Sequence, residues 1–219
     1  MMNLARLMGA PARGIALATL TLGLVGCYEK TPEQRDTSSA EQIFQLCGAC
    51  HGPDGAGKPE VNAPAIAGLN QAYVERQLHK FRLGARGLHF DDHAGMQMRP
   101  MAMTLTDKDI VTIAAFVSTL PPVTPAPRLE GGDAGRGKPL YAACAACHGQ
   151  KGEGNEQMKS PALTHASDWY LFTQLRHFKG GVRGANPIDS EGATMAPMAK
   201  TLADEQAMKD VLAYVATLK

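Results

Sequence analysis

Two segments of this 219-residue sequence carry a pair of cysteines followed directly by a histidine. Both have the pattern Cys-x-x-Cys-His, with Cys47, Cys50 and His51 in the first and Cys144, Cys147 and His148 in the second. The pattern is the attachment signature of c-type haem. Two thiols at this spacing can form thioether bonds to the two vinyl groups on one edge of a porphyrin, and the adjacent imidazole then lies under the iron. The sequence therefore predicts two covalently bound haem c groups.

Two other kinds of site use paired cysteines. A thioredoxin-like dithiol should accompany a βαβ pattern, and no alternating strand pattern of useful length occurs in the sequence. A zinc site formed by both pairs is the second alternative. Because the two motifs lie in register within an internal repeat, we favour haem attachment over both.

The internal repeat has a period of 97 residues. A shift by this length superposes the two motifs and many residues beyond them, among them Gly55 on Gly152, Pro64 on Pro161, Tyr73 on Tyr170, Gln77 on Gln174, Leu78 on Leu175 and Leu105 on Leu202. We therefore expect two copies of one domain, at residues 41–120 and 135–219. A linker rich in proline and glycine, residues 121–134, joins them.

Within each copy the only regular period is helical. A short amphipathic helix ends in each Cys-x-x-Cys-His segment, and a middle helix covers about residues 73–83 in the first copy and 169–179 in the second. The last helix begins near Thr106, where Asp109 completes a capping box, and near Asp204 in the second copy. The expected fold class is all-α, a tandem duplication of one haem-binding lobe with long loops.

A haem iron bound by one histidine needs a sixth ligand or keeps an open site, and this choice separates electron carriers from catalysts. Two pairs of methionines recur at the shift of 97, and they are Met98 with Met195 and Met101 with Met198. Because a proline lies between the methionines of each copy, we expect an extended loop that crosses a haem face just before the last helix. One methionine per copy is the expected ligand. The residues alone do not choose between the first and the second.

These motifs together resemble the bacterial di-haem class I cytochromes c of the cytochrome c-four type, over about residues 41–219. The resemblance is carried by both Cys-x-x-Cys-His motifs, the Gly-x-Gly after each, the Tyr-x-x-x-Gln-Leu helices and a methionine seven residues before a leucine in each copy. In this family that methionine binds iron. The resemblance therefore implies the axial ligands His51 and Met98 in the first copy and His148 and Met195 in the second.

Further contacts follow from the resemblance. The carbonyls of Pro64 and Pro161 would accept a hydrogen bond from the second ring nitrogen of each ligand histidine, which fixes the ring orientation. Phe44 and Tyr141 would pack the first helix of each copy against the last.

The N-terminal residues are typical of an export signal. An apolar run at 15–25 follows two arginines, and the first acidic residue is Glu29. The run ends in Leu-Val-Gly-Cys27, which resembles the lipobox of bacterial lipoproteins. We expect cleavage of a signal peptide at residues 1–26, lipidation of Cys27 and a tether at 27–40, so that the protein is lipid-anchored on the periplasmic side of a membrane. A cleaved signal with an incidental Cys27 is the alternative.

Composition limits the classes of partner. The chain has 22 basic and 21 acidic residues, so no basic field exists to gather phosphates, and a nucleic-acid binder is excluded. Four basic residues follow the middle helices and form either a set that neutralises haem propionates or a solvated basic face; they are Arg82, Arg86, Lys179 and Arg183.

Saturation of the iron indicates the function. With histidine and methionine both bound, no coordination position remains for a substrate, so we expect outer-sphere transfer of single electrons and no enzymatic activity. The expected partners are redox proteins such as a cytochrome bc complex, a dehydrogenase or a terminal oxidase. The alternatives are a di-haem enzyme, either a peroxidase or a sulfur-compound dehydrogenase, and a fixed electron-transfer subunit of a larger oxidoreductase complex.

Overall fold

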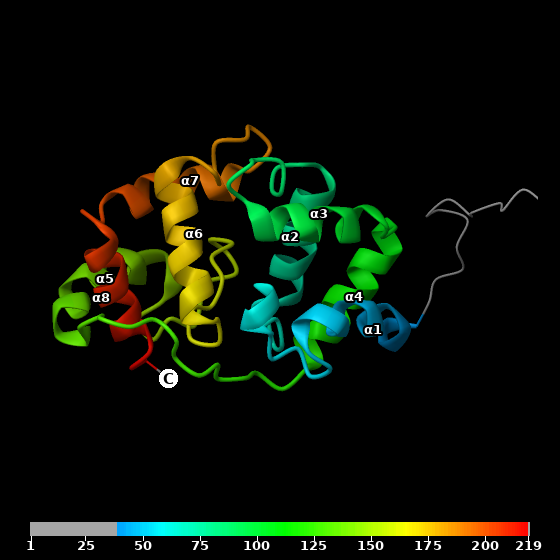
Figure 1. The fold of residues 1–219 in the computed structure, drawn as a ribbon, viewed down its shortest axis with the longest axis horizontal. Coiled ribbons are helices and arrows are strands. Elements are labelled where there is room, and N and C mark those ends of the chain that lie inside the picture. Colours follow the sequence, from blue (N-terminus) through cyan, green and yellow to red (C-terminus); the bar gives the residue numbers. More distant parts are fainter. Residues whose placement is uncertain (1–38, 219) are drawn as a thin grey trace, which may run out of the picture. The chain divides into compact units, whose positions relative to one another are not determined.

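The computed structural model describes residues 39–218, and this part of the chain is helical (Figure 1). The helices are α1 (Ala40–His51), the 3-10 turn η2 (Pro59–Val61), α2 (Gln71–Arg82), α3 (His93–Met103), α4 (Asp107–Thr119), α5 (Ala134–His148), α6 (Asp168–Gly180), α7 (Ser190–Lys200) and α8 (Glu205–Val215). Between residues 39 and 218 the only β-structure is two isolated bridges. The all-α class is confirmed, and no described helix is long and apolar enough to cross a membrane.

Local capping chemistry sets the starts of the helices. Thr106 caps α4, and its side chain and that of Asp109 form the expected reciprocal box. Asp204 caps α8 by accepting from the backbone N–H of Ala207, so both last helices begin where the sequence predicted. Helix α2 begins slightly earlier than expected because Asn70 caps it.

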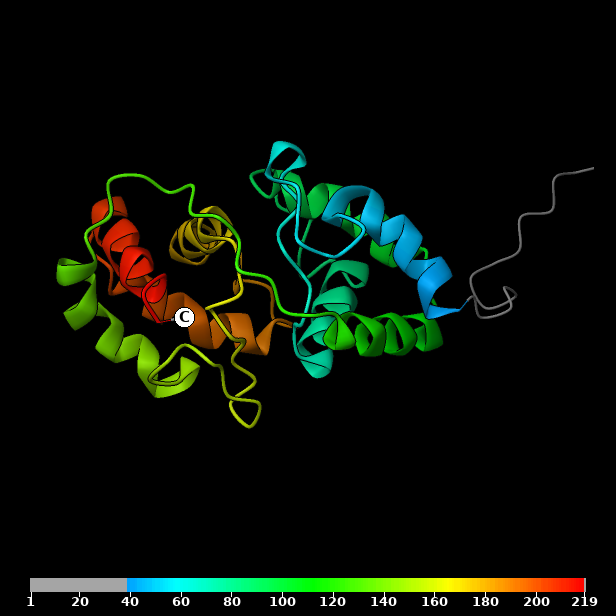
Figure 2. The same ribbon diagram turned by 90° about the horizontal axis from the view of Figure 1, so that it is seen from below.

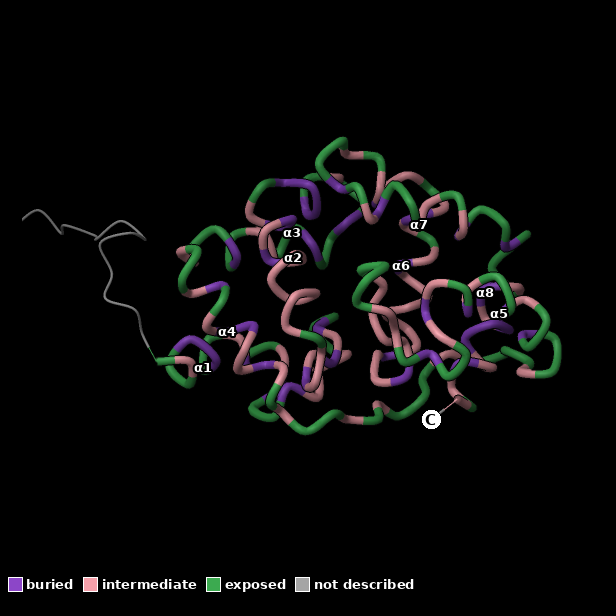
Figure 3. The backbone as a smooth tube through the Cα atoms, turned by 180° about the vertical axis from the view of Figure 1, so that it is seen from behind, coloured by how far each residue is buried: buried purple, intermediate pink, exposed green. Residues whose placement is uncertain are grey.

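In each lobe the first helix packs against the last (Figures 1 and 2). The rings of Phe44 and Phe116 lie 5.1 Å apart between α1 and α4, and those of Tyr141 and Tyr214 lie 5.5 Å apart between α5 and α8. The predicted packing is therefore confirmed. Buried stretches of these helices appear in purple in Figure 3. Burial of their apolar faces is the main stabilising term for each lobe.

The segments that carry the paired methionines are helices, so the expectation of an extended loop is wrong. The Asp92 side chain caps α3 by accepting from the backbone N–H of Gly95, and α3 packs against α2. A proline inside a helix removes one backbone hydrogen bond, and the cap together with the packing compensates for that loss at Pro100. Helix α7 repeats the arrangement, with a cap at Asp189 and an internal Pro197.

The linker between the lobes is tied to the second one. The backbone N–H groups of Arg128 and Leu129 donate to one carboxylate oxygen of Asp168, at 2.8 and 2.9 Å. Because Asp168 opens α6, this contact orients the chain that leads into the second copy.

Candidate haem sites

Both cysteine motifs form the last turns of a first helix. In α1 and α5 the histidine is the final helical residue, so the two thiols and the ring project from the same end of the helix. All four described cysteines are free thiols, and Cys47 and Cys144 each pack against the core of their lobe. Burial raises the pKa of Cys47 to about 11 and also raises that of Cys144, so both are protonated at neutral pH.

A backbone carbonyl fixes each histidine ring. His51 Nδ1 lies 2.8 Å from the carbonyl oxygen of Pro64, and His148 Nδ1 lies 2.8 Å from that of Pro161. These contacts confirm the predicted proline partners. Burial lowers the pKa of both histidines and outweighs the opposing effect of the carbonyl, so each ring is neutral at pH 7. With Nδ1–H donating to the carbonyl, Nε2 keeps its lone pair for a metal.

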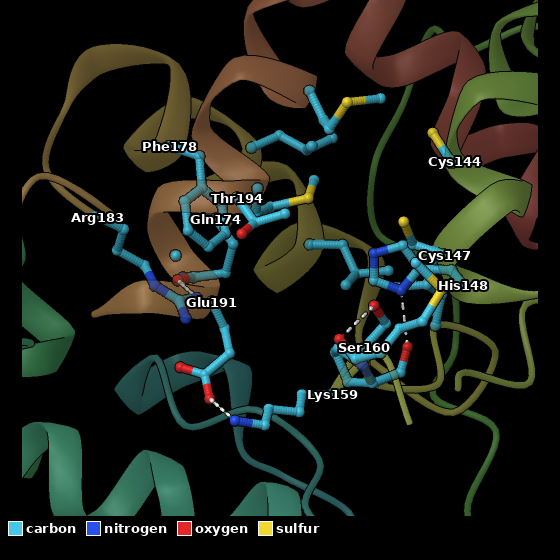
Figure 4. Close-up of a pocket in the computed structure, with 18 of the residues that line it drawn as sticks. Cys144, Cys147, His148, Lys159, Ser160, Gln174, Phe178, Arg183, Glu191 and Thr194 are labelled. Carbon is cyan, nitrogen blue, oxygen red and sulfur yellow. Dashed lines mark hydrogen bonds and ion pairs between the residues drawn. The ribbon is translucent and has the colours of Figure 1, made fainter. Parts of the chain in front are cut away.

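The second lobe contains a cavity of about 380 Å³ whose lining includes the residues predicted for the haem. Figure 4 shows Cys144, Cys147 and His148 on one side of this cavity, and Phe178 and Thr194 on the other. Apolar side chains form much of the remaining wall, and they include Leu140, Leu163, Leu171, Leu175, Leu202, Val211 and Leu212. Such a largely apolar cavity, with two thiols and one fixed neutral imidazole on one side, fits a covalently attached haem.

The methionines are placed differently in the two lobes. Met98 packs against the core of the first lobe, the same cluster that Cys47 contacts, whereas Met101 is 43% exposed. The Met101 side chain is therefore not part of the core of the first lobe. Met195 and Met198 both line the cavity of the second lobe. The assignment of Met98 and Met195 as ligands stays a prediction.

The four basic residues divide into two pairs. Arg86 and Arg183 are each only 5% exposed, so a solvated basic face is wrong for them. Arg86 donates to Gln77 at 2.9 Å, and Arg183 donates to Gln174 at 2.7 Å. Both leave a buried Nε–H without a hydrogen-bond partner among the described residues, and Arg183 lines the cavity. A buried guanidinium with a spare donor fits an anionic group such as a haem propionate.

The other two basic side chains hold the start of the last helix. Arg82 donates to the carbonyl of Leu105 and pairs with the Asp107 carboxylate. Lys179 donates to the carbonyls of Leu202 and Ala203. Arg82 and Lys179 therefore connect the middle helix of each lobe to the residues at the start of its last helix.

Sequence reasoning missed one pair of functional positions, the capping carboxylates Asp92 and Asp189. They are buried, and each accepts from the backbone N–H of the glycine three residues later, Gly95 or Gly192. A β-carbon at either glycine would lie 2.1 Å from the carboxylate, so only glycine fits. The recurrence of Asp-x-x-Gly at the shift of 97 was the available signal.

The sequence and the fold are similar to those of known proteins. The family model described as Cytochrome c matches the chain twice, at residues 38–121 and 134–219. Cytochrome c4 from Thiocapsa roseopersicina is 32% identical over 175 residues, which cover 74% of this chain and 84% of that protein. The thiosulfate dehydrogenase electron acceptor of Thiomonas intermedia is 33% identical over 152 residues, covering 65% of this chain and 66% of that protein. The crystal structure of reduced recombinant cytochrome c4 from Pseudomonas stutzeri is 26% identical with a TM-score of 0.64, covering 80% of this chain and 95% of that one.

Proposed function

The chain belongs to the cytochrome c family, and from this premise we propose that it carries single electrons between redox proteins, with one covalently bound haem c in each lobe. It is an electron-transfer protein and not an enzyme. The observation that carries the proposal is the cavity of the second lobe, which is lined by two thiols, a carbonyl-fixed neutral imidazole, two thioethers and many apolar side chains. The repeated sequence supplies the same donor set in the first lobe.

When bound, each haem supplies a one-electron couple between ferrous and ferric iron. The residues of the chain attach, orient and shield that group. Cys144 and Cys147 would attach it covalently, His148 would bind iron through Nε2, and the Pro161 carbonyl holds the ring in place. The apolar part of the wall would shield the haem from water, which disfavours the more highly charged ferric state and would raise the reduction potential.

The sixth ligand is proposed as Met98 in the first lobe and Met195 in the second. The burial difference between Met98 and Met101 supports the choice in the first lobe. In the second lobe the support is the equivalence of Met195 with Met98 at the shift of 97. With both axial positions bound, neither iron offers a site to substrate, which agrees with electron transfer.

We also propose that the protein is a lipid-anchored component on the periplasmic side of a membrane. The support is the Leu-Val-Gly-Cys27 sequence that ends an apolar run. Cys27 lies outside the described residues, as do the signal peptide and most of the tether. Stable anchoring would require two acyl signals, because a single acyl group binds a membrane only marginally.

The proposed electron donor is a periplasmic dehydrogenase. A relative that shares 33% identity with this chain is a thiosulfate dehydrogenase electron acceptor. A terminal oxidase is the proposed acceptor, and the support is a 31% identical relative named as a subunit of a cbb3-type cytochrome c oxidase.

Mass spectrometry of the mature protein tests the attachment sites. The wild type should carry two haem increments, and the double variant Cys144→Ser/Cys147→Ser should carry one. Cys27→Ser is the matched control, because it removes a cysteine outside both motifs and should keep two. A second haem retained in the double variant would contradict the assignment.

A further inference from the structure

The two helices that carry the proposed methionine ligands begin at contacts between the lobes. Asp189, the cap of α7, lies 2.6 Å from Nζ of Lys80 in α2 of the first lobe. Asp92, the cap of α3, lies 3.8 Å from Nδ1 of His177 in α6 of the second lobe. Lys80 and His177 are equivalent at the shift of 97, as are the two aspartates. Each lobe therefore presents one basic side chain to the capping aspartate of the other lobe's methionine helix.

The contact on Asp189 is a buried ion pair. Asp189 is fully buried and Lys80 is 8% exposed. One carboxylate oxygen, Oδ1, accepts from both Lys80 and the backbone N–H of Gly192, while Oδ2 has no hydrogen-bond partner among the described residues. Removing one partner of such a pair leaves an uncompensated buried charge, which is strongly destabilising. Asp189 therefore depends on Lys80.

Lys80 holds a second carboxylate of the same helix. Its Nζ lies 2.6 Å from Oε2 of Glu191, which stands in the first turn of α7. Burial alone would raise the pKa of Glu191, but the hydrogen bond and charge of Lys80, together with a backbone hydrogen bond and the charge of Lys159, lower it to about 2. Arg76, also of α2, lies 3.6 Å from the other oxygen of Glu191. The start of α7 is thus held by two cations of the first lobe.

The contact on Asp92 is weaker. Asp92 receives two backbone N–H groups of its own lobe, from Gly87 and Gly95, so both carboxylate oxygens have a partner without His177. Burial lowers the pKa of His177, and the positive charges of three arginines lower it further; they are Arg183, Arg86 and Arg176. The negative charge of Asp92 acts in the opposite direction but does not outweigh these effects. His177 is therefore neutral at pH 7 and supplies no charge to Asp92.

The first lobe also takes part in the wall of the second lobe's cavity. The side chains of α2 that line it are Tyr73, Arg76, Gln77 and Lys80. Glu191 of α7 also lines this cavity, and Figure 4 marks its ion pair with Lys159, at 3.8 Å, by a dashed line. A shift of α7 would therefore change the wall that Met195 and Met198 form.

We propose that Lys80 is a positioning residue for the second haem site: a side chain of the first lobe fixes the start of the helix that carries Met195. The inference rests on the proposed function, since it takes Met195 as the iron ligand. His177, the equivalent residue of the second lobe, is neutral at pH 7 and therefore does not fix the start of α3 in the same way. Contact between the lobes thereby sets the axial ligation of the second iron more strongly than that of the first.

The test compares Lys80→Met, Lys80→Arg and His177→Leu in the di-haem protein at pH 7.5. The first readout is hydrogen exchange of residues 190–200, and Lys80→Met should accelerate it by about tenfold or more, because a buried pair is broken. The second readout is the sulfur-to-iron charge-transfer band of the ferric protein. Lys80→Met should weaken the part of this band that Met195→Ala also removes, and should have no further effect when combined with Met195→Ala. Lys80→Arg should restore both readouts, and His177→Leu should leave exchange in α3 unchanged.

Three results would overturn the inference: unchanged exchange in α7 with Lys80→Met, further loss of the band when Lys80→Met is added to Met195→Ala, or no rescue by arginine. Absence of the band from the wild type would instead refute the proposed methionine ligation. Hydrogen exchange would still decide in that case whether Lys80 holds α7.

Discussion

Replacing the proposed axial methionines one at a time should separate iron ligands from neighbouring methionines. We expect Met98→Ala and Met195→Ala each to remove the sulfur-to-iron charge-transfer band of one haem. Because the two lobes carry the same donor set, each variant should keep about half of the band, and the double variant should keep none. The assay is the absorbance of the ferric protein at the red end of its visible spectrum.

The size of the accompanying stability change follows from burial. Full burial of a methionine side chain is worth about 1.5 to 3 kcal/mol. Met98 is only partly buried against the core of its lobe. We therefore expect Met98→Ala to lower the free energy of unfolding by about 1 to 2 kcal/mol from packing alone, and by more in the haem-loaded protein because an iron–sulfur bond is lost as well.

Met101→Ala and Met198→Ala are the matched controls. Met101 is 43% exposed, so its truncation should leave the band intact and the stability nearly unchanged. Met198 shares the cavity with Met195 and is the stricter control. If Met198→Ala removes the band while Met195→Ala keeps it, the ligand of the second lobe is assigned one helical turn too early. If no methionine affects the band, methionine ligation is refuted in both lobes.

Three further predictions address the anchor, the cap of α7 and the response to pH. Cys27→Ser should move the protein from the membrane to the soluble fraction, and unchanged membrane attachment would count against lipidation. Gly192→Ala should lower the free energy of unfolding in denaturant by about 1 to 3 kcal/mol, because the new methyl group would lie 2.1 Å from Asp189 Oδ2; Gly180→Ala, where nothing lies within 4 Å, is the control and should be neutral or stabilising. Burial lowers the pKa of His177 below its ordinary value of 6.5, so this residue binds fewer protons in the folded than in the unfolded state, and its contribution to stability falls as the pH drops below about 6.5. His177→Gln should therefore flatten the loss of stability between pH 7.5 and 5, and an equal slope in both proteins would show that His177 does not titrate in this way.

Features that depend on neighbouring residues were predictable from the sequence. The capping box of Thr106 and Asp109 is a local exchange of hydrogen bonds, and it forms where it was expected. The proline carbonyls that hold His51 and His148 followed from a family resemblance, since no spacing rule connects residues 13 positions apart in this way.

Features set by tertiary contacts were not predictable. The rule that a proline disfavours helix in the preceding residue indicated a loop, but the Asp92 cap and packing on α2 outweigh it around Pro100. The burial of Arg86 depends on Tyr170 and Gln174, which are far away in the sequence. The role of Asp189 likewise became visible only when the fold brought Lys80 to it.

A reductive titration of the purified di-haem protein, with and without carbon monoxide, tests whether each lobe holds one haem whose two axial positions are both filled by the chain. We predict that the protein takes up two electrons per chain and that carbon monoxide leaves the spectrum of the reduced protein unchanged. Uptake of a single electron, or a spectral shift on adding carbon monoxide, would contradict this arrangement, because a haem would then be missing or an iron would be open to ligands.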